Sequence, residues 1–104
     1  MTSRPFHYAL DEERGVLVLH GELDEPASTE LRETITKATK ELTSGLAIDL
    51  ADVSFLPSPA IGVLATAKED ARSHGATITF VAPEGSVAAR LLTICALDHV
   101  EELA

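Results

Sequence analysis

The stretch LAIDLADVSFLPSPAIGVLATA, residues 46–67, decides the fold of this chain of 104 residues. Its first five residues are apolar except for one aspartate, which predicts a short buried strand over residues 46–50. Two prolines then flank Ser58 at a favourable helix start, and a helix is predicted over residues 58–73. Because a strand that leads into a helix is half of a β–α–β unit, the stretch predicts a parallel sheet covered by helices.

The segments before this stretch predict a hairpin and a helix. Residues 6–10 and 15–23 have the composition of strands and are separated by the charged turn 11–14, so we expect them to pair as antiparallel strands. Residues 24–26 then start a helix. Its apolar residues, which recur at spacings of three and four, are Ala27, Leu31, Ile35, Ala38 and Leu42.

The segments after the stretch repeat the order of strand and helix. Residues 76–81 are rich in β-branched side chains and predict a strand, and residues 83–84 open a third helix. A last short helical turn is expected over residues 98–103. The apolar face of the third helix is predicted to consist of Val87, Leu91 and Ile94 or Cys95.

The predicted order is β, β, α, β, α, β, α, with the last turn as an optional fourth helix. This order indicates a single α/β domain over residues 1–104, in which residues 1–5 form a short tail. The four-stranded sheet is mixed: the opening hairpin is antiparallel, and the later strands run parallel through right-handed crossovers. Loops that leave the carboxyl ends of parallel strands meet at one edge, so residues 24–26, 52–58 and 83–86 are the expected functional loops.

Charge and composition exclude several classes of partner. Seventeen acidic residues against eight basic ones give a formal charge of −9. This charge repels nucleic acid and anionic lipid surfaces; it either attracts a basic protein partner or only favours solubility. A single cysteine, no segment typical of a signal peptide and no run long enough to span a bilayer predict a soluble protein of the reducing cytosol.

We find no pattern that predicts catalysis, a metal site or a cofactor. The four histidines are scattered without helical pair spacing, and no glycine-rich phosphate loop or nucleophile elbow occurs. We interpret Cys95 as a small buried apolar residue. Asp24, Asp49 and Asp52 lie near strand ends and form either an acidic cluster or, as we prefer, turn residues and helix caps. The sequence therefore predicts a protein that is not an enzyme.

Ser58 has two interpretations. Serine is a favoured N-cap, so its oxygen would accept a hydrogen bond from the amide of Ala60 or Ile61. It is also a possible phosphorylation site, because a helix N-terminus stabilises the negative charge that a phosphoryl group adds. We prefer the cap, although the residue type agrees with both roles.

Three motifs together resemble the STAS domain, the family of anti-sigma factor antagonists. They are GELD at residues 21–24, IDLADVSF at residues 48–55 and IGV at residues 61–63, behind the helix start. The similarity covers nearly the whole chain. It implies a STAS-like fold and a bacterial cytoplasmic regulator that binds an anti-sigma factor, often a serine kinase, until that kinase phosphorylates a serine at the head of the second helix.

The chain departs from the family at that serine. The family typically has Asp-Ser-Ser-Gly or Asp-Ser-Thr-Gly and is phosphorylated on the second hydroxyl residue, whereas this chain has PSPA at residues 57–60. Matched position by position, Ser58 takes the first hydroxyl position, Pro59 the phosphoacceptor position and Ala60 that of the glycine. The usual phosphorylation therefore cannot occur, and Ser58 would serve only if a kinase accepted a shift by one residue.

The prolines instead favour a stiff, permanently partner-binding loop. The candidate partner-binding residues are Asp24, Leu56, Pro57, Ser58, Pro59 and Ile61.

Three functions are compatible with the resemblance. The first is an anti-sigma factor antagonist that frees a sigma factor for transcription. The second is a non-catalytic subunit of a lipid-transport ATPase complex, since some lone STAS proteins support such complexes without a phosphoserine. The third is a nucleotide or small-ligand sensor with a pocket around Asp24 and Ser58, which no phosphate-binding loop supports.

Overall fold

The computed structural model describes residues 4–41 and 45–102. Four strands form one sheet in the order β1-β2-β3-β4. The pair β1 and β2 is antiparallel and the other two pairs are parallel, as predicted. The elements along the chain are β1 (His7–Asp11), β2 (Val16–Glu22), α1 (Glu25–Glu41), β3 (Leu46–Phe55), α2 (Ser58–Ser73), β4 (Ile78–Val81) and α3 (Val87–Ile94).

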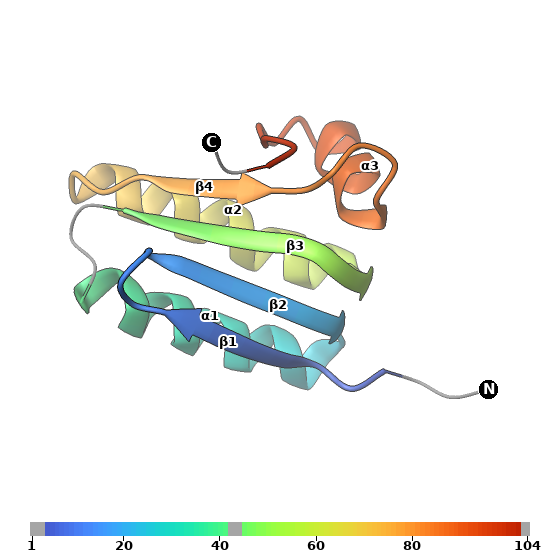
Figure 1. Ribbon diagram of the computed structural model, residues 1–104, viewed down its shortest axis with the longest axis horizontal. Coiled ribbons are helices and arrows are strands. Elements are labelled where there is room, and N and C mark those ends of the chain that lie inside the picture. Colours follow the sequence, from blue (N-terminus) through green and yellow to red (C-terminus); the bar gives the residue numbers. More distant parts are fainter. Residues whose placement is uncertain (1–3, 42–44, 103–104) are drawn as a thin grey trace.

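Helices α1 and α2 lie side by side behind one face of the sheet, and α3 lies beyond the carboxyl end of β4 (Figure 1). The core fills the space between the sheet and these helices. In β2, Leu17 and Leu19 are fully buried against the helices, while His20 on the other face is half-exposed. Leu31 of α1 and Leu64 of α2 belong to the same core on the helix side. The burial of each such leucine side chain stabilises the folded state by about 1.5–3 kcal/mol.

Several element boundaries differ from the sequence prediction. Helix α3 begins at Val87, after the N-cap Ser86, and not at residues 83–84, and β4 begins at Ile78 and not at residue 76. Strand β3 runs to Phe55 because Asp52 and the residues after it also pair with β2, across two register shifts. Residues 98–102 are not helical. Val100 lies beside β4 and forms an isolated parallel bridge with Val81. Val100 N donates to Phe80 O at 2.9 Å, and Ala82 N donates to Val100 O at 2.8 Å.

Helix α3 turns the opposite face to the core from the one predicted. Its buried residues are Ala88, Ala89 and Leu92. Val87 and Ile94 are exposed, and so is Cys95, which corrects our interpretation of that cysteine as buried. The predicted apolar face of α1 is buried at each described position, and Leu42 lies outside the described residues.

Residues 4 and 5 pack on the sheet and are not part of a tail. Glu22 N donates a hydrogen bond of 3.0 Å to Arg4 O. The carbonyl oxygens of Arg4 and Pro5 lie where a Cβ of residue 21 would stand, so only glycine fits there. None of the described helices is long and apolar enough to cross a membrane.

Candidate functional site

The three helices begin at the edge of the sheet where the parallel strands end (Figure 1). The loops after β2 and β3 are held together there, because Leu23 N donates to Phe55 O at 3.0 Å. This bond places the start of α1 beside the start of α2. The sequence prediction that the functional loops share one edge is therefore consistent with the geometry.

Asp24 is the N-terminal cap of α1. Its Oδ1 accepts a hydrogen bond from Ala27 N at 3.0 Å. Its carbonyl oxygen accepts from Ser28 N at 2.9 Å and from Ser28 Oγ at 3.0 Å, and Ser28 is the one buried polar side chain among the described residues. The preferred interpretation of Asp24 as a cap is confirmed, because its carboxylate accepts a hydrogen bond from the backbone of the first turn of α1.

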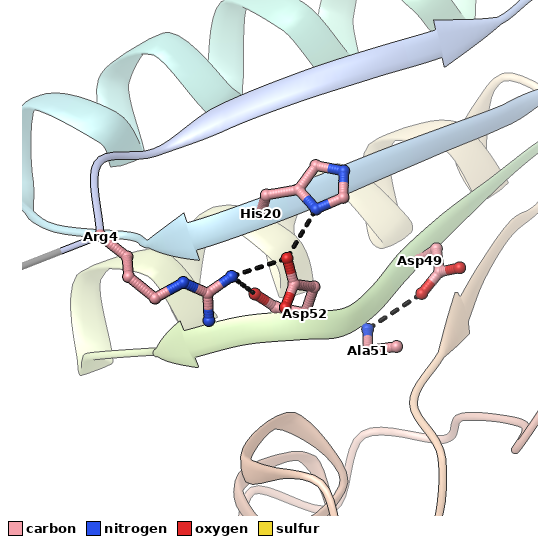
Figure 2. Close-up of polar contacts among 5 residues, drawn as sticks. All are labelled: Arg4, His20, Asp49, Ala51 and Asp52. Atoms are coloured by element: carbon pink, nitrogen blue, oxygen red, sulfur yellow. Dashed lines mark hydrogen bonds and ion pairs between the residues drawn. The ribbon is translucent and has the colours of Figure 1, made fainter.

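The other two aspartates form no acidic cluster with Asp24. Asp49 Oδ1 accepts from Ala51 N at 2.9 Å, within its own strand. Asp52 Oδ2 lies 2.7 Å from an Arg4 guanidinium nitrogen and 2.7 Å from His20 Nδ1, on the sheet face opposite to α1 and α2 (Figure 2). The hydrogen bond with His20, and then that with Arg4, lower the pKa of the Asp52 carboxyl.

Ser58 is not the cap of α2. Pro57 holds the N-cap position with an extended backbone, and no side chain caps this helix. Ser58 and Pro59 are therefore its first two residues, and the first hydrogen bond of the helix runs from Ile61 N to Pro57 O at 3.1 Å. The predicted bond from the amide of Ala60 or Ile61 to the Ser58 oxygen does not form; Ser58 is exposed, and its hydroxyl has no hydrogen bond to the residues that the structure describes.

The candidate partner-binding residues divide into a buried and an exposed group. Leu56 is 3% exposed and belongs to the core, so it offers no contact surface, and Ile61 is half-buried against the core. Ser58 and Pro59 are exposed and Pro57 is half-exposed. Phe55, which is not among the candidate residues, is 49% exposed at the end of β3. No local signal predicts this exposure, because Ser54 and Phe55 are both exposed and the alternation of buried and exposed residues breaks at this end of β3.

The acidic and histidine side chains at this edge form no metal site among the described residues. No three His, Cys, Asp or Glu side chains of residues 4–41 and 45–102 are placed to hold a metal ion. A cavity of about 390 Å³ lies away from the edge, between the C-terminal halves of α1 and α2, where Ile35, Ala71 and His74 line it. Where β3 passes into α2, this edge exposes Phe55, Ser58 and Pro59, none of which carries a charge.

Residues 6–103 match the family model described as "Mlab, STAS domain". The chain belongs to the STAS domain family. This match covers nearly all of the chain and confirms the resemblance carried by the sequence motifs.

Solved STAS structures share the fold. An anti-sigma factor antagonist from Mycobacterium paratuberculosis has a TM-score of 0.78 at 22% identity, over 95% of this chain and 88% of that one. The anti-sigma factor antagonist SpoIIAA in its unphosphorylated form has a TM-score of 0.67 at 17% identity, over 95% and 90%. The Bacillus cell fate determinant SpoIIAA in the phosphorylated form has a TM-score of 0.64 at 18% identity, over 89% and 85%.

Proposed function

We propose that this STAS domain is an anti-sigma factor antagonist of the cytosol. It binds an anti-sigma factor through the head of α2 and so frees a sigma factor for transcription. The observation that carries the proposal is the exposed Pro59 in the first turn of α2, at the family's phosphoacceptor position. We call Phe55, Pro57, Ser58 and Pro59 the α2-head surface.

The composition of the α2-head surface favours protein binding. Phe55 and the two prolines bring apolar area whose removal from water favours binding, and none of the four side chains carries a charge that must be desolvated. Each proline fixes one backbone angle in the free protein. This segment therefore loses less conformational entropy on binding than a loop of serine and glycine would.

The same residues argue against the family's usual switch. SpoIIAA is known in an unphosphorylated and a phosphorylated form, whereas Pro59 has no hydroxyl to accept a phosphoryl group. The second route is phosphorylation of Ser58, which is exposed at the first position of α2. The chain needs no catalytic group of its own in either case, and control passes to the partner if Ser58 stays unmodified.

The proposal is tested by affinity purification of the tagged protein from its native cells, with mass spectrometry of what co-purifies. We expect wild type to recover an anti-sigma factor and Pro59→Glu to reduce the affinity for that protein about tenfold or more, because the change puts a charge into the apolar contact. The matched control is Pro26→Glu, which makes the same change at the second position of α1.

Both glutamates enter the first turn of a helix, where the helix dipole favours an acid, so both variants should melt at or above the temperature of wild type. Unchanged recovery of the anti-sigma factor by folded Pro59→Glu would show that the α2-head surface is not the contact. Equal losses in both variants would point to a general effect of charge at this edge.

The second candidate is a non-catalytic STAS subunit of a lipid-transport ATPase complex. Two observations favour it: the matching family model carries the name Mlab, and Pro59 removes the need for a phosphoserine. The same purification separates the two functions. Recovery of a nucleotide-binding transport subunit in place of an anti-sigma factor would establish the second and exclude the first.

A further inference from the structure

Helix α3 is apolar on the face that the fold does not use. Ala88, Ala89 and Leu92 bury one side of it. On the other side, Val87 is 44% and Ile94 71% exposed, with half-buried Leu91 between them. We call Val87, Leu91 and Ile94 the α3 stripe; their spacing of four and three residues aligns them along one side of the helix.

Leu91 also packs against the core, but the fold gives no reason for apolar side chains at Val87 and Ile94. Contiguous exposed apolar residues on a small domain commonly mark an interaction surface. Polar side chains at Val87 and Ile94 would leave the buried face of α3 unchanged. The stripe is therefore best explained by something that covers it in a complex.

The surroundings of the stripe determine the charge of that partner. A groove of about 510 Å³ runs beside Ile94, and its ionisable lining residues are Glu84, Glu101, Arg90 and His99. Within the described part of the chain, neither glutamate is placed in a salt bridge. With the net charge of −9, this rim attracts basic groups and repels a second copy of the chain as well as an anionic membrane surface.

We propose that the α3 stripe and its groove bind a basic amphipathic helix of the protein partner. Apolar side chains of that helix would cover Val87, Leu91 and Ile94, while its lysines or arginines would meet Glu84 and Glu101. The inference rests on the proposed function and adds a second contact to it. The two surfaces are neighbours, because α3 packs on β3 and lies near the carboxyl end of that strand (Figure 1).

The first test needs no knowledge of the partner. It is an NMR titration of the whole protein with a designed leucine and lysine amphipathic helical peptide, and with a counterpart in which glutamate replaces lysine. We expect the lysine peptide to shift the amide signals of α3 and of the groove, and the glutamate peptide to shift none. Shifts confined to other elements, or equal shifts with both peptides, would overturn the inference.

The second test uses the partner protein that co-purifies with the wild-type bait. It measures how tightly this partner binds the variants Ile94→Lys and Ile94→Glu. Both variants remove the apolar contact, but only lysine places a positive charge against a basic partner. We therefore expect Ile94→Lys to weaken binding about tenfold or more, and Ile94→Glu distinctly less. The control is Tyr8→Lys, at a side chain that is 41% exposed on the opposite edge of the sheet.

The two proposals fail in different ways. If Pro59→Glu weakens binding and Ile94→Lys does not, the α2-head surface stands and the α3 inference is wrong. If the lysine peptide binds α3 while the bait recovers no anti-sigma factor, the proposed function is wrong and the α3 surface stands. Equal losses in the two Ile94 variants would contradict a basic partner.

Discussion

Gly21 sits where β2 meets the N-terminal segment, and its backbone permits that contact. Its φ is +87°, and a Cβ on it would collide with the carbonyl oxygens of Arg4 and Pro5. We predict that Gly21→Ala lowers the free energy of unfolding by about 1–2 kcal/mol from its backbone angle alone, and further from the collision. Urea unfolding followed by circular dichroism measures this loss.

The control at the same scale is Gly62→Ala. Gly62 lies within α2 and nothing stands within 4 Å of the position of its Cβ. Alanine there should raise stability by roughly 0.5–1 kcal/mol, because it is the better helix former. A loss of similar size in both variants would contradict the special role that we assign to Gly21.

The helices begin in different ways, and this difference is testable at the scale of elements. Ser86 caps α3, with its Oγ accepting from Ala89 N at 3.1 Å, whereas Ser58 caps nothing. We predict that Ser86→Ala costs about 1 kcal/mol of stability and that Ser58→Ala stays within about 0.5 kcal/mol of wild type. Equal costs in thermal or urea unfolding would restore the interpretation of Ser58 as a cap.

Helices α2 and α3 show why the sequence predicts the bounds of one helix but not which face of the other is buried. The bounds of α2 follow from prolines at its start and a glycine after its end, and both are local signals. The orientation of α3 has no such signal, because Val87, Leu91 and Ile94 match the helical period as well as the residues that are buried. The two alanines at the buried face let α3 approach the sheet closely, and only packing against β3 selects that face.

At the scale of the whole molecule, Asp52 joins the N-terminal segment to β2 and β3 through Arg4 and His20. Its pKa in the folded protein lies below the ordinary value of 3.8, so the unfolded state binds more protons as the pH falls. The resulting stabilisation is complete above about pH 3.8 and disappears as the pH falls through the folded pKa. We predict that wild type is more stable than Asp52→Asn near neutral pH and loses this advantage in that acidic range.

Unfolding curves of both proteins across the acidic range provide the measurement. The control is Asp49→Asn, because that carboxylate accepts one backbone hydrogen bond within β3 and joins no other segment. A difference between wild type and Asp52→Asn that stays constant through the acidic range would show that this carboxylate contributes nothing through its charge.

The sequence by itself determined the order of the elements, the parallel crossovers and the presence at residue 59 of a proline, which has no hydroxyl. These features depend on periodicity, on turn residues and on the identity of one side chain, all of which are local. The tertiary structure alone decided that α3 turns Ile94 outward, that Phe55 is exposed while Leu56 is buried, and that Arg4 reaches Asp52. Each of these depends on contacts between residues far apart in the chain, which compete for the same buried space.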